Sequence, residues 1–111
     1  MADSSDRFLA SRLSHVEHVA LYRKNLRLVC PRCRRVRILN AAGTWWLFTQ
    51  RRWNDSLKDA SQRFHCGACY EAGHGRIRPA IRITDEDETP GHQLPPPPER
   101  DWRRLVSRYR S

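Results

Sequence analysis

The sequence has no long apolar run and little hydrophobic content overall. Only 39% of its 111 residues are hydrophobic, and its mean hydropathy is −0.80. No stretch approaches the roughly 18 apolar residues that span a membrane. The first six residues are polar and acidic, whereas a secretory signal is basic and then apolar. These absences exclude a large apolar core, and we expect one small, cross-linked, cytoplasmic domain with tails.

Residue arrays typical of enzymes are also missing. The sequence contains no Ser/His/Asp array, no glycine-rich phosphate loop and no paired catalytic carboxylates. Residues 85–88 are four consecutive acids, but such a run in a loop is usually solvated. We therefore expect that the protein is not an enzyme and has no small-molecule substrate.

The positive charge is concentrated in the middle of the chain. Residues 23–82 carry fourteen Arg or Lys against three acids, a net charge of +11, while the two ends are each slightly acidic. A basic surface of this kind attracts polyanions such as nucleic acid, acidic proteins or anionic lipid. Nineteen of the 21 basic residues are arginine, which favours bidentate contacts to phosphate or carboxylate, although a codon preference would produce the same count.

The same middle segment holds all four cysteines, in two Cys-x-x-Cys pairs: Cys30 with Cys33, and Cys66 with Cys69. Two intervening residues let a tight turn direct two sulfurs at one ion, and a second pair completes a tetrahedron. The spacing predicts one Zn²⁺ bound by four thiolates, which leaves no position for a catalytic water. Metal binding of this kind contributes about 10 to 16 kcal/mol, so we expect metal removal to unfold residues 27–84.

Other interpretations of the cysteines and nearby histidines stay open at this stage. Each pair can be a redox dithiol, four thiolates also bind iron, and unligated core cysteines are a further alternative. His65 and His74 adjoin the second pair, where hydrogen bonding to a sulfur or packing nearby is a better interpretation than ligation. His15 and His18 lack further ligands for a second metal.

Local patterns predict short helices and strands. Ser14 and Glu17 match a capping box for a helix over residues 15–24, ending at Asn25. Alternating residues predict strands at 26–30, 36–39, 63–65 and 76–84, the last an edge strand because of Pro79. Residues 40–43 suggest a turn, after which Thr44 begins a Trp-rich helical insertion. Asp55 begins a second helix through residue 61. A helical turn over residues 6–13 is also expected.

The composition changes at residue 85. An acidic and proline-rich linker, residues 85–98, is predicted to be extended and largely unfolded. Residues 99–111 form a tail with the pattern of an amphipathic basic helix, which is expected to form on a partner or on the domain itself. The acidic residues 85–88 can also fold back on the basic face and weaken polyanion binding.

With both Cys-x-x-Cys turns at the ends of short strands, residues 26–84 resemble the zinc-ribbon superfamily. The LRLVCPRCRR and RFHCGAC segments, followed by RIRP, resemble small bacterial zinc-ribbon proteins. The resemblance implies a β-hairpin zinc site and no defined activity. Two departures are the long spacer and the lack of Gly after each second cysteine, where Arg34 and Tyr70 stand.

The expected fold is therefore a small α+β metal-bound domain. It consists of an N-terminal helical segment (residues 1–25) and a zinc ribbon with short antiparallel strands (residues 26–84), into which a Trp-rich helix is inserted at 44–61. The linker (85–98) and a disordered C-terminal tail (99–111) follow.

Two functions are compatible with this reading. The first is a nucleic-acid-binding module, for DNA or RNA, in which arginines contact phosphates: Arg32, Arg34, Arg35, Arg37, Arg51, Arg52, Arg76 and Arg78. The second is an adaptor that docks an acidic protein through exposed apolar residues: Trp46, Trp53, Trp102, Leu105, Val106 and Tyr109. Most tryptophans of the insertion are expected in the core, with Trp46 and Trp53 the better candidates for contact.

Overall fold

Three antiparallel strands form the centre of the fold. The structure is a computed structural model, and it describes residues 13–91 and 93–109. Strands β1 (Asn25–Val29), β2 (Val36–Asn40) and β3 (Ala80–Thr84) pair in the order β2-β1-β3. The first two strands are confirmed to within one residue. The third is shorter than predicted but lies at the edge of the sheet, as expected.

Alternating residues give the sheet one apolar face. Leu26 pairs with Leu39 of β2 and with Ile83 of β3, and directly opposed residues point to the same side of a sheet. Leu26 is completely buried. The next residue, Arg27, pairs with Ile38 and therefore points to the opposite face. The apolar face is the one that the helices cover.

Helix α2 (Val16–Leu21) is capped by Asp55, a residue remote in sequence, so the predicted capping box is wrong. Ser14 Oγ lies 2.8 Å from His15 Nδ1, and the N-cap residue His15 makes no side-chain capping bond. Instead, the carboxylate of Asp55 accepts the backbone N–H of Glu17 at 3.0 Å, and the Asp55 carbonyl accepts a second amide of this turn at 2.8 Å. A carboxylate is a stronger acceptor than a hydroxyl, and its charge suits the positive end of the helix.

The end of α2 differs from prediction as well. The helix stops at Leu21, and Arg23 then adopts a left-handed backbone with φ of 58°. Asn25, expected as the C-cap, is the first residue of β1, and its side chain donates to the carbonyl of Glu86 at 2.9 Å. Helix formation therefore ends early because the chain must turn into the central strand.

Helix α3 (Ala41–Arg51) begins directly after β2, without the predicted turn at 40–43. Asn40 is its N-cap, and the Asn40 side chain accepts the N–H of Gly43 at 2.9 Å. Thr44, the predicted cap, is buried inside the helix and donates its hydroxyl to the Asn40 carbonyl at 2.8 Å. Asn is as good an N-cap as Thr, and Asn40 occurs first along the chain.

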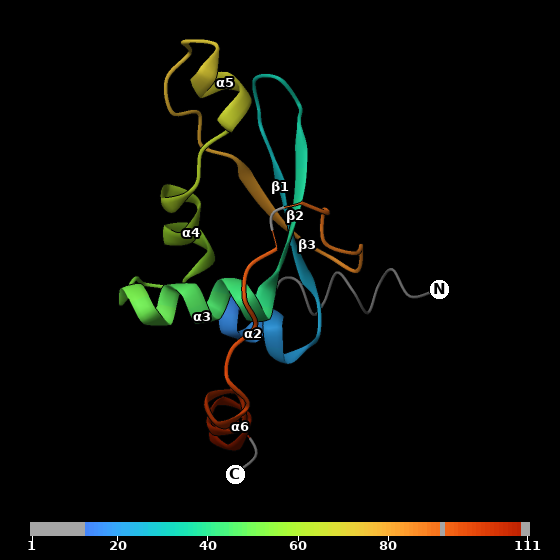
Figure 1. Cartoon of the computed structure of the whole chain (residues 1–111), viewed down its shortest axis with the longest axis vertical. Coiled ribbons are helices and arrows are strands. Elements are labelled where there is room, and N and C mark those ends of the chain that lie inside the picture. The colour runs from blue at the N-terminus through green and yellow to red at the C-terminus, as the bar shows by residue number, and fades with distance from the viewer. Residues whose placement is uncertain (1–12, 92, 110–111) are drawn as a thin grey trace.

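The segment between α3 and β3 contains three short helical elements. Helix α4 (Leu57–Ala60) is capped by Ser56 instead of Asp55, which caps α2. A 3-10 helix, η1 (Ser61–Arg63), replaces the start of the predicted strand at 63–65, and the rest of that segment is irregular. Helix α5 (Gly67–Glu71) follows. Figure 1 shows α4 running from the end of α3 up to α5, which lies beside the turn between β1 and β2.

One apolar core joins most of these elements. It brings together buried residues of α2, β1, β2, α3 and α4 with one residue of the C-terminal helix. Its members are Leu13, Val16, Val19, Ala20, Leu26, Leu28, Leu39, Ala41, Trp45, Phe48, Ala60 and Leu105. The inserted helix α3 thus supplies a core that a thin sheet lacks, as expected for most of its aromatic residues.

The C-terminal segment is packed on the domain. The amphipathic helix expected within residues 99–111 is present and lies on the domain itself, whereas the expectation of a disordered tail and of a largely unfolded linker is wrong. The Thr89 hydroxyl accepts the Ile38 N–H at 2.8 Å, and the Thr89 N–H donates to the Ile38 carbonyl at 2.9 Å, which extends the edge of β2. Helix α6 (Glu99–Arg108) buries Leu105 completely. Figure 1 shows the chain crossing over α3 before it enters α6.

In the part of the chain that the structure describes, no helix has the length and apolar character needed to cross a membrane. The helical turn predicted over residues 6–13 lies almost wholly outside the described residues.

Candidate functional site

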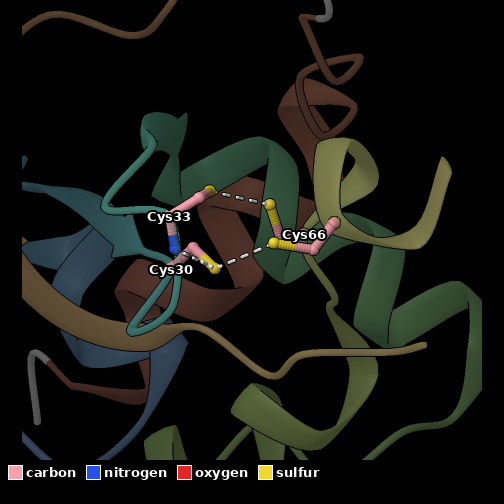
Figure 2. A group of neighbouring side chains, drawn as sticks. Cys30, Cys33 and Cys66 are labelled. Carbon is pink, nitrogen blue, oxygen red and sulfur yellow. Dashed lines mark hydrogen bonds between the residues drawn. The ribbon is translucent and has the colours of Figure 1, made fainter. Parts of the chain in front are cut away.

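The four cysteines meet at one end of the molecule. Cys30 and Cys33 lie in the turn between β1 and β2. Cys66 is the N-cap of α5, and Cys69 lies within that helix. Figure 2 shows the side chain of Cys33 directed toward Cys66 across the space between the turn and α5. The two pairs, with 32 residues between them in the chain, are thus brought together as their spacing predicted.

The sulfur positions fit a four-coordinate metal. All four Sγ atoms lie within 4.8 Å of one another, and the Sγ atoms of Cys30 and Cys69 are 3.7 Å apart. Those of Cys33 and Cys66 are 3.6 Å apart. A tetrahedron with metal–sulfur bonds of about 2.3 Å has sulfur–sulfur edges of about 3.8 Å. Both of these contacts join one pair to the other, and all four cysteines are free thiols.

The protonation of the thiols reflects their surroundings. The backbone N–H of Cys33 points at the sulfur of Cys30 at 3.5 Å and lowers the pKa of Cys30 to about 6, against the opposing effect of burial. Burial raises the pKa of Cys69 to about 12, with the neighbouring thiols contributing in the same direction. Without a cation, the surroundings therefore favour the thiolate form of Cys30 and the protonated form of Cys69. A bound metal ion would deprotonate all of its thiol ligands.

Backbone hydrogen bonds hold the first cysteine turn in shape. The Cys30 N–H donates to the Arg35 carbonyl at 3.0 Å, and the Arg34 N–H donates to the Cys30 carbonyl at 2.9 Å. Arg34 has a φ of 66°, in the left-handed region where glycine is favoured. Arg34, which follows the second cysteine of this pair, therefore adopts a backbone conformation that glycine adopts more readily.

The second pair departs further from a ribbon. A zinc ribbon places its second pair at a hairpin turn, whereas Cys66 and Cys69 here lie in the first turn of α5, with the Tyr70 N–H donating to the Cys66 carbonyl at 3.0 Å. The segment that leads from α5 back to β3 is hydrogen-bonded to the start of α5, because the Cys66 N–H donates to the Ile77 carbonyl at 2.9 Å. The structure shows a small α+β fold in which four clustered cysteines are placed to bind a metal ion.

The cysteine cluster is separate from the main core. Cys30, Cys66 and Cys69 form a small buried group with Ala68 and Ile77, and none of these residues belongs to the core around α3. Few backbone hydrogen bonds tie residues 64–79 to the sheet. Metal removal should therefore unfold mainly the cysteine-bearing end of the molecule, and not all of residues 27–84 as the sequence predicted.

Histidines lie near the cluster but outside its ligand group. The metal-binding group found among the described residues consists of the four cysteines alone. The ring of His65 packs against Tyr70, with centroids 5.2 Å apart. His74 donates its backbone N–H to the Cys69 carbonyl at 2.9 Å. His15 and His18 pack edge to face at 5.1 Å. The packing of His65 agrees with the role expected beside the second pair, and among the described residues neither His65 nor His74 hydrogen-bonds to a cysteine sulfur.

Comparison with known proteins finds no relative of this chain: no family model, no curated protein and no solved structure matches it. The zinc-ribbon resemblance therefore rests on the two cysteine pairs and on the hairpin that carries the first of them.

All eight arginines predicted to contact phosphates are exposed. Six belong to the segments that carry the cysteines: Arg32, Arg34, Arg35, Arg37, Arg76 and Arg78. Arg51 and Arg52 instead end α3, which Figure 1 shows to point away from the sheet, apart from the cysteine turn. Among the described residues, none of the eight makes an ion pair with an acid.

The apolar residues predicted to meet a partner are largely used within the chain. Leu105 is completely buried, and Trp102 packs edge to face on Trp45 at 6.2 Å. Trp53 packs on Phe48 at 5.2 Å. Of the predicted set, Trp46 and Val106 remain partly exposed, and Tyr109 is 51% exposed. The C-terminal segment has therefore formed its helix on the domain itself.

The acidic run does fold back, but onto the sheet and not onto the predicted phosphate contacts. Asp85 pairs with Lys24 at 2.5 Å, and Glu86 lies 3.7 Å from the guanidinium of Arg27. Both partners are in or next to β1. The eight arginines stay accessible in its presence.

Sequence reasoning missed one feature of the surface. Arginines of α6 line a groove against α3, together with Trp46. The spacing of Arg100, Arg104 and Arg108, four residues apart, could have revealed this row, because such residues share one side of a helix. The packing of α6 on α3, which creates the groove, has no comparable signal in the sequence.

Proposed function

We propose that the protein is a non-enzymatic nucleic-acid-binding module whose cysteine-bearing end is held together by a structural zinc ion. Four thiolates fill the coordination sphere of Zn²⁺ and leave no open position for a substrate or an activated water. The ion would tie the β1–β2 turn to α5, two segments that otherwise share little packing. Its role would therefore be to hold a surface in place.

Zinc fits better than the other interpretations of the cysteines. A thioredoxin-like dithiol needs a βαβ unit, whereas the sheet in the described residues is entirely antiparallel. Redox pairs also act separately, whereas here the sulfurs of both pairs lie in one cluster, within 4.8 Å of one another. Iron can occupy the same four thiolates, and an iron site would give the purified protein a visible colour that zinc does not.

The observation that carries the nucleic-acid proposal is the exposed arginine surface around the cysteines. Arg32, Arg34 and Arg35 occupy the turn itself, and all three are exposed without an ion pair among the described residues. Guanidinium groups in this state are available for bidentate contacts with phosphate oxygens. Arg76 and Arg78 lie on the return from α5, so the metal would hold both groups together.

Salt dependence tests this proposal. The full-length protein is titrated into labelled duplex DNA, single-stranded DNA and RNA at about 50 and about 200 mM salt. The double variant Arg34→Ala/Arg35→Ala is compared with Arg82→Ala, which removes an exposed charge from β3. Log affinity falls as log salt rises, and each phosphate contact makes this negative slope steeper by about 0.7 to 0.9. The double variant should make the slope shallower by about 1.5, and Arg82→Ala should leave it unchanged.

Absence of binding to every nucleic acid at low salt would contradict the proposal. An adaptor for an acidic protein is the alternative, and a pull-down with and without nuclease separates the two. Partners that survive nuclease treatment would favour the adaptor. Because Trp102 and Leu105 pack within the chain, such an adaptor would have to use the arginine surface and not a C-terminal anchor.

A further inference from the structure

A groove of about 890 Å³ lies between α3 and α6. Two neighbouring tryptophans of α3, Trp45 and Trp46, line one side of it, and α6 lines the other with four arginines and two acids, Glu99 and Asp101. Its volume is within the range of about 300 to 1,000 Å³ that small-molecule sites occupy. Apolar rings and cationic side chains therefore face one open space, remote from the cysteines.

The two tryptophans have different roles in the groove. Trp45 is only 6% exposed and packs edge to face on Trp102 of α6 at 6.2 Å, so it joins the two helices. Trp46 lies 6.1 Å from Trp45 between ring centroids and is partly exposed. Trp46 is thus the ring that a ligand can reach, and Trp45 holds it from behind.

The arginines on the opposite wall form a row along α6. Arg100, Arg104 and Arg108 follow one another at four-residue intervals, which places them on the same side of the helix. All three are exposed, and none of their guanidinium groups has a hydrogen bond or ion pair with any residue in 13–91 or 93–109. Arg103 differs, because Glu99 binds it at 2.5 Å. The row therefore consists of cations that no acid of the described residues pairs with directly, although Asp101 lines the same groove.

We propose that this groove binds single-stranded nucleic acid, with an unpaired base on the ring of Trp46 and phosphates on Arg100, Arg104 and Arg108. This inference rests on the proposed function and deepens it by naming the class of nucleic acid. Aromatic rings beside cationic side chains are the combination that single strands use, because every base has a face that stacks and every linkage has a charge.

Other polyanions use the groove less fully. In a duplex the base faces are stacked on each other, so they are closed to Trp46. An acidic peptide would neutralise the arginines but would leave the ring without a planar partner. Figure 1 shows α6 and α5 at opposite ends of the molecule, so a strand in this groove would not depend on the arginines around the cysteines.

The test uses the full-length protein and labelled oligothymidylate and oligouridylate, with a duplex of the same length for comparison. Trp46→Ala should weaken single-strand binding about tenfold while leaving the salt slope unchanged, because stacking carries no charge. Trp46→Phe should restore most of the affinity. Arg104→Ala should weaken binding and lower the salt slope by about 0.7, one single-strand phosphate contact. Arg82→Ala on β3 is the charge-matched control.

Each outcome decides the proposal. Unchanged single-strand affinity in Trp46→Ala and Arg104→Ala, with weaker binding in Arg34→Ala/Arg35→Ala, would overturn the groove assignment and leave the proposed function standing. An equal loss of duplex binding in Trp46→Ala, or displacement of the oligonucleotide by oligoglutamate of equal charge, would also overturn it. No binding by the wild-type protein at low salt would remove both proposals together. Arg104 is exposed, so its variant tests the groove even if Trp46→Ala is unstable.

Discussion

Gly43 is the point where the chain that leads to α6 crosses α3, and replacing it with alanine should dislodge that crossing. A Cβ atom at position 43 would lie 2.9 Å from Leu94 Cβ, 3.0 Å from the Leu94 carbonyl oxygen and 3.2 Å from the Pro95 carbonyl oxygen. Two of these three atoms belong to the backbone, so no side-chain rotation can relieve the contact. The crossing segment itself must move.

The net effect of Gly43→Ala follows from two opposing contributions. Alanine inside a helix is favoured over glycine by about 1 kcal/mol. Overpacking costs about 1 to 3 kcal/mol, and a clash with backbone belongs in the upper half of that range. Gly43→Ala should therefore lower the free energy of unfolding by about 1 to 2 kcal/mol. It should also loosen α6 and weaken binding in the groove.

Gly67→Ala is the matched control. Gly67 also lies in a helix, but a Cβ there would meet no atom within 4 Å. Without a clash, Gly67→Ala should leave the free energy of unfolding unchanged or raise it by up to about 1 kcal/mol. Urea denaturation of zinc-loaded protein measures both variants. A Gly43→Ala protein at least as stable as the wild type, beside a Gly67→Ala protein that is not destabilised, would refute the crossing of residues 94–95 over α3.

Four further predictions follow from particular contacts. Arg34→Gly should raise the free energy of unfolding by about 0.5 kcal/mol, because it relieves a left-handed φ of 66°, and Arg34→Ala should not; equal stabilities in urea would contradict this. Asp55→Ala should lower the free energy of unfolding by about 1 kcal/mol through loss of the α2 cap, and Asp55→Asn by less; two equal losses would argue against the cap. The Glu17 carboxylate accepts a hydrogen bond from the Tyr109 hydroxyl, which raises the pKa of Tyr109 to about 12. A raised pKa stabilises the fold only while the phenol is protonated, so the advantage of wild type over Tyr109→Phe should shrink as the pH rises from about 10 to about 12; a constant difference would exclude this effect. Chelation of the metal should abolish hydrogen-exchange protection in α5 while α2 and α3 keep theirs, since the cysteine group lies outside the main core; simultaneous loss in all three helices would show that the two regions unfold together.

Features that depend on neighbours in the chain were predictable from the sequence. The alternation of apolar and basic residues predicted β1 and β2, and the two Cys-x-x-Cys pairs predicted a shared metal site. Both predictions depend on spacing within a few residues. Because the two Cys-x-x-Cys pairs have the same spacing, they also predicted that two segments distant in the chain meet. The exposure of the eight arginines was equally predictable from their charge.

Features that depend on tertiary contacts were not predictable. Ser14 and Glu17 form a recognisable capping box, yet Asp55, remote in sequence, supplies the stronger acceptor for α2. Residues 85–98 have the composition of an unfolded linker, but Thr89 pairs with Ile38 and the next segment crosses Gly43. Composition describes what a segment does alone, and these contacts exist only after the sheet and α3 have formed.

The metal centre is the claim on which the rest of this account depends, and the metal content of freshly purified full-length protein tests it most directly. Elemental mass spectrometry should find one zinc ion per chain in the wild type and markedly less in Cys33→Ser. Cys33 is the most accessible of the four cysteines. Absence of both zinc and iron from the wild type, or an equal zinc content in the variant, would contradict a site built from these four cysteines.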